Sequence, residues 1–306
     1  MEKRYPGTIL ATACVPWTES YEIDEPVFIA GVRKLLDQNL RHIYLFGTAG
    51  EGYAVSDRQY QRLVTLFVQA MDRPDCQPMI GLISLSFETM KERLAFAYAQ
   101  GIRDYMFAFP AWGALQDDEL DLFLHDLLDP YPDCRFLHYN NVRSKRLLSA
   151  KEYEVLAETF PNLAGAKYST GDLSVILSLA ANPSPLRFFL TETGFSYGSQ
   201  IGDFGLLLSI GNCNLPQAWR YYEACLAHQT EAVIRMQQEL SEMTQKLKAV
   251  VGPGIKIDGS YDKIFSKIQD PAFPLRLLPP YIGTTDEAYQ AFCAYLRKEQ
   301  PAWIDA

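Results

Sequence analysis

The sequence is dominated by short apolar runs rich in β-forming residues, which recur with helical patterns between them. Eight such runs follow one another along the 306-residue chain, separated by roughly 20 to 35 residues, a spacing typical of repeated βα units and a parallel sheet. The predicted strands are 8–15, 42–48, 78–84, 104–110, 135–140, 163–169, 187–192 and 205–210.

Helix start and stop signals lie between these runs. Ser56 with Gln59 and Ser149 with Glu152 form capping boxes, and Gly101 follows the helical pattern 90–100 as a helix-ending residue. Eight βα units fill the roughly 250 residues of a (β/α)8 barrel. We therefore predict an α/β protein with a TIM barrel. The alternative is an open doubly wound sheet, but no Gly-rich phosphate-binding pattern follows the first strand.

The last third of the chain is helical in pattern. Apolar residues recur at helical spacing over 221–227, 231–250 and 286–298, with an interruption at Gly252-Pro253-Gly254. No low-complexity linker precedes this part. We predict a barrel domain over 1–216 and a C-terminal helical extension over 217–306 that packs on the barrel.

Composition excludes several classes of function. The formal net charge of -9 argues against nucleic acid or an anionic membrane as the partner. No apolar run reaches the roughly 20 residues of a membrane span, and residues 1–6 lack the apolar core of a signal peptide. The six cysteines and four histidines are dispersed without metal-binding spacing. We predict a cytoplasmic protein without a structural metal.

Lys167 is the most informative residue, because the apolar strand predicted over 163–169 would not ordinarily carry a lysine. Burial disfavours the ammonium form and is expected to lower the pKa of Lys167, which makes the amine a nucleophile able to form a Schiff base with a ketone. The alternative is a lysine at a frayed strand end with its ammonium group in water.

Other chemically useful residues follow the other strands. In a barrel, catalytic groups stand at the carboxyl ends of the strands, which here brings Tyr139 and the loop at Thr48 to the same mouth as Lys167. The Tyr139 phenol can move protons during imine chemistry, and Thr48 can orient that phenol. Free backbone N–H groups of the glycine loop, at Gly50, can bind a carboxylate.

These residues stand in three motifs that resemble those of a known family. Gly47-Thr48-Ala49-Gly50-Glu51, then Tyr139-Asn140, then Gly165-Ala166-Lys167 leading to Gly171-Asp172 follow in order. They are similar to the GTTGE, YN and GIKxxxGD patterns of the dihydrodipicolinate synthase / N-acetylneuraminate lyase family of class I aldolases. The resemblance extends over essentially the whole chain, including Gly205-Leu206-Leu207.

The resemblance implies a role for each matching residue. Lys167 would be the Schiff-base lysine, Tyr139 the general acid/base and Thr48 its relay partner. Ala49, Gly50, Glu51 and Leu207 would lie at the substrate. The family's catalysis needs no metal or organic cofactor, and its members are usually tetramers built as dimers of dimers.

Two departures from the family pattern concern the substrate. Ala49 replaces a hydroxyl residue that helps to hold the pyruvate carboxylate, which weakens the assignment of pyruvate unless the loop N–H groups suffice. Trp112 stands near the position at which dihydrodipicolinate synthases have a tyrosine that reaches into the neighbouring subunit. An indole cannot relay a proton. The sequence around Trp112 resembles instead that of the hydratase-aldolase branch, in which Trp112 would stack on the substrate. The alternative is that Trp112 packs at a subunit contact.

Two further departures concern charged groups. Val142 replaces the proline expected after Tyr139-Asn140, which leaves both Arg143 and Arg146 as candidates for the arginine that binds substrate carboxylate. A solvated basic loop is the alternative for each. Glu192, at the end of the seventh strand, is expected to contact substrate or to pair with a loop arginine.

The sequence therefore predicts a Schiff-base-forming lyase that makes or cleaves a carbon–carbon bond between a 2-keto acid of the pyruvate type and an aldehyde. An aromatic aldehyde or the aldehyde of a sugar acid fits better than aspartate semialdehyde. The alternatives are dihydrodipicolinate synthase activity, dehydration of a keto-deoxy sugar acid, a barrel that only binds keto acids, and a barrel of unrelated chemistry with a structural Lys167.

Overall fold

Eight parallel strands form a closed barrel in the computed structural model, which describes residues 2–254 and 256–304. Each strand pairs with the next in chain order, and β8 pairs with β1 to close the sheet. The predicted TIM barrel is confirmed. The strands are β1 (Ile9–Thr12), β2 (His42–Leu45), β3 (Gln77–Leu82), β4 (Asp104–Phe107), β5 (Arg135–Asn140), β6 (Leu163–Tyr168), β7 (Arg187–Leu190) and β8 (Gly205–Leu207).

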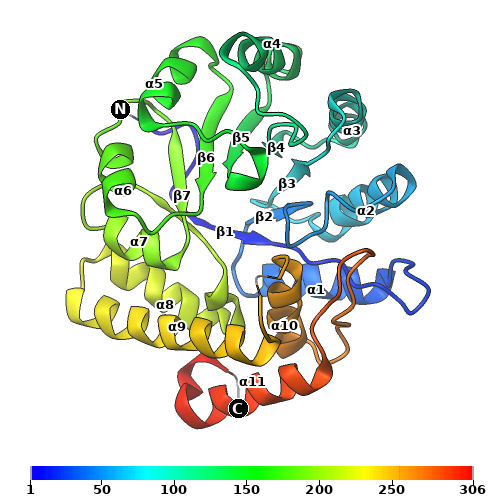
Figure 1. Cartoon of the computed structure of the whole chain (residues 1–306), viewed down its shortest axis with the longest axis vertical. Helices are drawn as coiled ribbons and strands as arrows, with labels where there is room; N and C mark the ends of the chain where they lie inside the picture. Colours follow the sequence, from blue (N-terminus) through cyan, green and yellow to red (C-terminus); the bar gives the residue numbers. More distant parts are fainter. Residues whose placement is uncertain (1, 255, 305–306) are drawn as a thin grey trace.

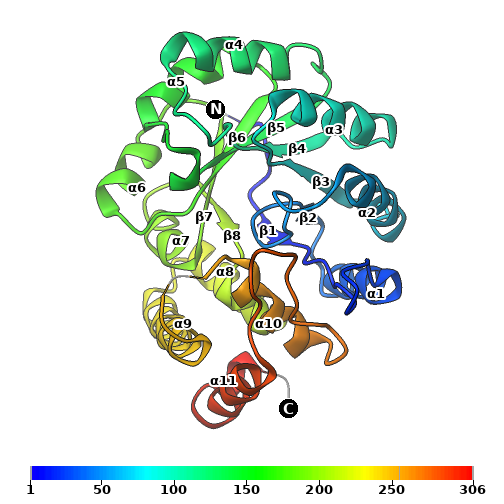
Figure 2. The ribbon, with the colours of Figure 1, turned by 45° about the vertical axis from the view of Figure 1, so that its right-hand side comes forward.

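A ring of helices surrounds this barrel, one after each strand (Figures 1 and 2). The ring consists of α1 (Glu25–Asp37), α2 (Asp57–Ala70), α3 (Phe87–Ala99), α4 (Asp117–Leu128), α5 (Ala150–Thr159), α6 (Leu173–Ala180), α7 (Glu192–Gly198) and α8 (Leu215–Leu226). Both predicted capping boxes are present, at Ser56 before α2 and at Ser149 before α5.

Most predicted strands extend too far at their carboxyl ends. The second strand stops at Leu45 rather than at Thr48, because Phe46 adopts a left-handed φ of 66° that ends the extended conformation. The chain then turns into the loop that carries Thr48. The residues beyond each strand thereby become loops at the mouth of the barrel, where functional groups of this fold lie.

The apolar core has two parts. The larger part lies between the sheet and the helices, and the smaller fills the barrel interior. Gly165 on β6 is needed for this packing, because a Cβ atom there would lie 2.2 Å from the carbonyl oxygen of Arg187 on β7. The interior side chains are Tyr5, Leu10, Tyr44, Met79, Met106, Ala108, Leu137, Tyr139, Ala164, Phe189 and Leu207.

The C-terminal part consists of α9 (Thr230–Val251), α10 (Gly259–Gln269) and α11 (Asp286–Glu299). Helix α9 packs on α7, α8 and α11, whereas α10 contacts the 3-10 turn Ile210–Cys213 beside the barrel mouth. Figure 2 shows α10 between α9 and α1, and Lys267 of α10 pairs with Asp286 at the start of α11. The sequence did not predict α10. The predicted boundary after residue 216 falls inside α8, and the division into two domains stays a prediction.

None of the helices in the described part of the chain has the length and apolar character needed to cross a membrane.

Candidate active site

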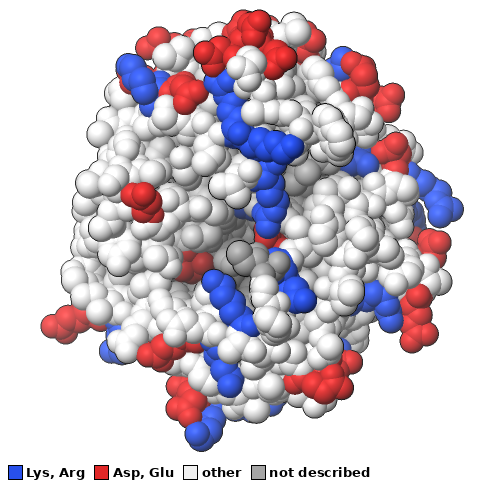
Figure 3. Space-filling view, in the orientation of Figure 1, with Lys and Arg blue, Asp and Glu red and all other residues white. Residues whose placement is uncertain are grey.

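A pocket of about 300 Å³ opens at the carboxyl ends of the strands. The face drawn in Figure 3 is hollowed near its centre, and Lys and Arg side chains border the hollow. Of the predicted site residues, the pocket is lined by Ala49, Tyr139, Lys167, Glu192 and Leu207. These residues come from the loop after β2, from β5, β6 and β8, and from the start of α7, so the barrel brings distant segments to one place.

Lys167 and Tyr139 are direct neighbours across the β5–β6 pairing. Both side chains point into the barrel, and the Lys167 ammonium nitrogen lies 3.8 Å from the centre of the Tyr139 ring. It also donates a hydrogen bond of 3.2 Å to the hydroxyl of Tyr44 on β2. Lys167 is 5% exposed, so the prediction of a buried strand lysine describes it better than the alternative of an ammonium group in water.

Thr48 lies behind Tyr139 rather than at the pocket surface. Its hydroxyl donates to the Tyr139 hydroxyl across 3.4 Å, a long hydrogen bond, and Thr48 is itself buried. The arrangement therefore places a phenol between a hydroxyl donor and the amine of Lys167. Such a phenol can pass a proton to or from an atom bound at the amine.

The predicted direction of the Lys167 pKa shift is wrong. Burial does act to lower the pKa of Lys167, but interactions with Tyr139, Tyr44 and Asp258 act in the opposite direction and together outweigh it, so the pKa is raised. The oxygen-bearing side chains around the amine stabilise its ammonium form. A nucleophilic amine at this position requires a group that accepts the ammonium proton.

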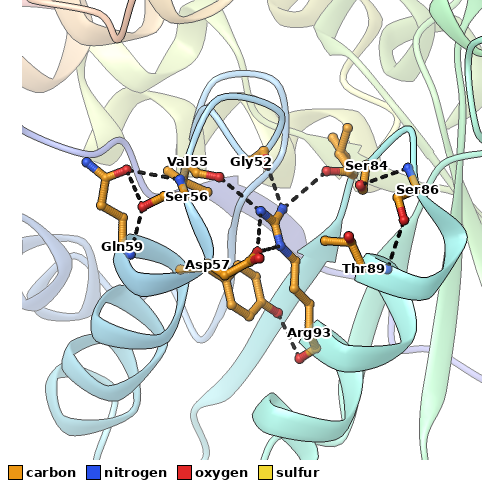
Figure 4. A network of polar contacts seen from close by, with 11 residues as sticks. Gly52, Val55, Ser56, Asp57, Gln59, Ser84, Ser86, Thr89 and Arg93 are labelled. Carbon is orange, nitrogen blue, oxygen red and sulfur yellow. Dashed lines mark hydrogen bonds and ion pairs between the residues drawn. The ribbon is translucent and has the colours of Figure 1, made fainter.

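The loop after β2 holds the backbone of the glycine motif close to the sheet. A Cβ atom on Gly50 would lie 2.8 Å from the Phe46 nitrogen and 3.0 Å from the Ala13 carbonyl oxygen, so only glycine fits there. The buried guanidinium of Arg93 on α3 fastens the end of this loop, donating to the carbonyls of Gly52 and Val55 and pairing with Asp57 (Figure 4).

Glu51 does not reach the pocket, contrary to the expectation that it lies at the substrate. Its carboxylate is fully buried, where it accepts hydrogen bonds from the Trp17 indole at 2.8 Å and from the Leu278 backbone at 2.7 Å. It also forms an ion pair of 2.5 Å with Lys263 of α10. With these three partners, Glu51 fastens the C-terminal part of the chain to the barrel.

Curated relatives come from the family that the motifs at this site resemble, although no family model matches the chain. The chain is 20% identical to 4-hydroxy-tetrahydrodipicolinate synthase of Parasynechococcus marenigrum over 281 residues, which cover 91% of this chain and 92% of that enzyme. It is 25% identical to N-acetylneuraminate lyase of Rattus norvegicus over 181 residues, 56% of this chain and 55% of that lyase. These relatives support the assignment of the chain to the dihydrodipicolinate synthase / N-acetylneuraminate lyase family, which its motifs resemble.

Solved structures named for this family have the same fold. A dihydrodipicolinate synthase family protein of Coccidioides immitis superposes with a TM-score of 0.83 at 18% identity, covering 99% of each chain. A prophage protein of E. coli K12 from the dihydrodipicolinic acid synthase family, solved in complex with pyruvate, gives a TM-score of 0.81 at 15% identity, covering 95% of this chain and 98% of that one.

Trp112 in the loop after β4, and Arg143 and Arg146 in the loop after β5, are not among the residues that line the pocket. Trp112 is 83% exposed and lines no part of the pocket, so nothing in the described chain supports substrate stacking by its ring. Arg146 pairs with Asp117 and Glu152 on neighbouring helices. Arg143 instead pairs with Asp258 at 2.8 Å, which makes Arg143 the loop arginine nearer to the pocket.

Glu192 lines the pocket, but its carboxylate is held by the protein backbone. It accepts hydrogen bonds from the backbone N–H groups of Ser209 at 2.7 Å and Gly211 at 3.0 Å. Burial raises the pKa of Glu192 in spite of these hydrogen bonds. The predicted alternative, an ion pair with Arg143 or Arg146, does not occur, because both arginines have other partners.

The pocket residues that the sequence did not predict include Tyr44, Asp258 and Asp262, which have titratable side chains. Tyr44 could have been predicted, because side chains alternate between the two faces of a strand and Tyr44 lies on the predicted strand 42–48. Asp258 and Asp262 had no such signal, because they lie at the start of an unpredicted helix. Their place at the pocket is seen only in the structure, where α10 packs beside the mouth of the barrel.

Proposed function

We propose that this chain is a class I aldolase that forms a Schiff base between Lys167 and a 2-keto acid of the pyruvate type. The observation that carries the proposal is the buried amine of Lys167 beside the Tyr139 phenol, with the Thr48 hydroxyl behind it, at the mouth of the barrel. Lyases named among the relatives, and a family structure in complex with pyruvate, support it.

In the proposed reaction, the amine of Lys167 attacks the ketone carbon and water leaves to give an iminium. The iminium withdraws electrons from the adjacent carbon, which either loses a proton to become an enamine or releases an aldehyde by carbon–carbon cleavage. Tyr139 moves the protons on the imine side, oriented by Thr48. Backbone N–H groups of the loop at Ala49 and Gly50 would bind the keto-acid carboxylate, and Leu207 would form the apolar wall.

Borohydride trapping tests this proposal directly. The chain is incubated with pyruvate, reduced, and examined by intact mass and peptide mapping. A reduced pyruvyl adduct on Lys167 that is lost in Lys167→Ala is the expected result. The absence of an adduct with pyruvate and with longer 2-keto acids contradicts the proposal.

The aldehyde partner is proposed to be the aldehyde of a sugar acid or an aromatic aldehyde rather than aspartate semialdehyde. Dihydrodipicolinate synthases use a tyrosine near the position of Trp112 to relay protons, whereas the Trp112 indole cannot relay one and is exposed to solvent. Dehydration of a keto-deoxy sugar acid through the same imine is the second candidate, favoured by the carboxyl groups of Glu192, Asp258 and Asp262 at the pocket. A turnover screen that measures aldehyde release and water loss separately distinguishes the two.

We also propose that the chain functions as a homotetramer in the cytoplasm. Leu173 and Leu177, one turn apart on α6, are each more than half exposed, as in a helix face that meets another subunit. All six cysteines, each within the described part of the chain, are free thiols, which suits a reducing compartment. Light scattering coupled to size-exclusion chromatography measures the oligomer, and a monomeric mass contradicts it.

A further inference from the structure

Asp262 is a buried carboxyl group that faces the pocket without a partner. It is 8% exposed and lines the same cavity as Lys167 and Tyr139. Over residues 2–254 and 256–304, no other residue donates a hydrogen bond to its carboxylate or forms an ion pair with it. Burying an unpaired carboxylate is costly, and proteins ordinarily supply partners for such groups. Because Asp262 lines the pocket, a ligand bound there would supply the missing partner.

The other carboxylates of the pocket differ from Asp262 in this respect. Glu192 is held by two backbone N–H groups, and Asp258 is paired with Arg143. One oxygen of each is engaged within the protein, Oε1 of Glu192 and Oδ1 of Asp258. Asp262 differs because no other residue among those described makes such a contact with its carboxylate oxygens, which suits it to exchange protons with what binds next to Lys167.

The position of Asp262 is fixed by the residue that follows it. Lys263 is fully buried and paired with Glu51 of the loop after β2, and its amine also donates to the carbonyl of Arg276. These contacts hold the first turns of α10 against the barrel. A side chain on a helix anchored in this way has little freedom to leave the pocket.

We propose that Asp262 is a second acid–base residue of this site, which accepts the ammonium proton of Lys167 and returns it to the departing water during imine formation. This inference rests on the proposed Schiff-base function. Asp262 lines the same pocket as Lys167, and its charge interacts with that of Lys167 although, within the described residues, the two groups form no ion pair, whereas Tyr139 lies beside the amine on β5. Asp262 and Tyr139 can therefore serve different proton transfers of one reaction.

In the proposed step, the Asp262 carboxylate takes one proton from the Lys167 ammonium group through a bridging water in the pocket. The free amine then forms the C–N bond as the carbonyl π electrons move to oxygen. Tyr139 carries a second proton from nitrogen to that oxygen, which gives the carbinolamine. Asp262 returns its proton to the hydroxyl, the C–O bond breaks, and water leaves. The iminium keeps one N–H, and both Asp262 and Tyr139 regain their starting states.

The titration of Asp262 supports this role. Burial and the nearby charge of Asp258 raise the pKa of Asp262 to about 8, and Glu192 adds to the rise while Lys167 opposes it. A group that titrates near neutral pH is suited to both accepting and donating a proton. The other titratable side chains that interact with Asp262 are Tyr44 on β2, Cys14 after β1 and Cys213 in the turn after β8.

The rate of imine formation with pyruvate tests the proposal without knowledge of the aldehyde. Wild type, Asp262→Asn and Asp262→Glu are mixed with pyruvate, quenched with borohydride after set times from about pH 6 to about pH 10, and read by intact mass. Wild type is expected to accelerate with pH and level off above about 8. Asp262→Asn is expected to lose this inflection and to form the imine about 100-fold more slowly.

The final extent of Lys167 modification at saturating pyruvate is expected to be unchanged in Asp262→Asn, and Asp262→Glu is expected to recover an inflection. If Asp262→Asn keeps the inflection and forms the imine at an undiminished rate, the proposal is overturned. It is also overturned if the only change in the variant is a higher pyruvate concentration needed for half-maximal rate. Absence of a wild-type adduct at every pH overturns the Schiff-base function as well, which separates the two failures. Matching thermal melting curves show that the variants are folded.

Discussion

Glu51 and Lys263, which lie far apart in the sequence, form an ion pair of 2.5 Å in which neither side chain is exposed to solvent. Glu51 belongs to the glycine-loop motif after β2, and Lys263 belongs to α10. The pair therefore connects the loop that carries Thr48 and Gly50 to the helix that carries Asp262. Two walls of the pocket are fixed by one buried contact.

Removing one member of this pair is expected to destabilise the fold strongly. Glu51→Gln leaves the Lys263 ammonium group buried without a counter-charge, which costs about 3–5 kcal/mol of unfolding free energy. Urea unfolding followed by circular dichroism measures it. Glu25→Gln is the matched control, because the Glu25–Arg62 pair is exposed and is worth less than about 1 kcal/mol. Equal losses in the two variants would contradict the role of Glu51.

The Tyr139 hydroxyl and the Thr48 hydroxyl are expected to contribute unequally to turnover. Tyr139→Phe removes the proton carrier beside Lys167 and is expected to lower the rate of methyl proton exchange of pyruvate by about 100-fold or more. Thr48→Val removes only a long hydrogen bond of 3.4 Å, and a loss of about fivefold is expected, since such a bond contributes about 1 kcal/mol. The measurement is NMR of pyruvate in deuterated water.

The order of these effects is the informative result. A Thr48→Val variant that is slower than Tyr139→Phe would show that the Tyr139 phenol is not the principal proton carrier.

Asp262 is expected to weaken the fold as pH rises. Its pKa is about 8 in the folded chain, above the roughly 4 of an unfolded aspartate. The folded state thus holds a proton that the unfolded state has lost, and stability falls between about pH 4 and about pH 8. Asp262→Asn is expected to be more stable than wild type at pH 8 by a few kcal/mol, with little difference at pH 4, in urea unfolding at both pH values. A variant less stable than wild type at pH 8 would contradict this.

Neutralising Asp258 is expected to move the pH dependence of imine formation. The charge of Asp258 raises the pKa of Asp262, so Asp258→Asn is expected to shift the inflection below its wild-type position of about 8 while leaving an inflection in place. The trapping experiment described above gives the curve. A shift to higher pH would mean that Asp258 acts on a different group.

The barrel and its central chemistry could be predicted from the sequence because both depend on local patterns. Each predicted strand is an apolar run with its own boundary signals, and Lys167 is conspicuous because a charge interrupts such a run. The pairing of Tyr139 with Lys167 follows from the order of strands in a barrel.

The far wall of the pocket could not be predicted, because it depends on contacts between distant segments. Helix α10 is short, begins after a Pro/Gly-rich segment and has no side-chain cap at Asp258, so its start has no sequence signal. Its place over the mouth involves contacts with distant segments, among them the Glu51–Lys263 pair and the hydrogen bonds from Gln269 to Asn212. The resemblance placed Glu51 at the substrate, whereas three protein partners occupy its carboxylate.

The dependence of the pocket on α10 has a consequence for the order in which the protein becomes active during its synthesis. The ribosome delivers Lys167, Tyr139 and Thr48 well before Asp262, Lys263 and the backbone of Leu278 that also holds Glu51. A nascent chain can close all eight strands and still lack one wall of its pocket. Chemistry that uses Asp262 together with Lys167 therefore becomes possible only after α10 has been synthesised and has packed against the barrel.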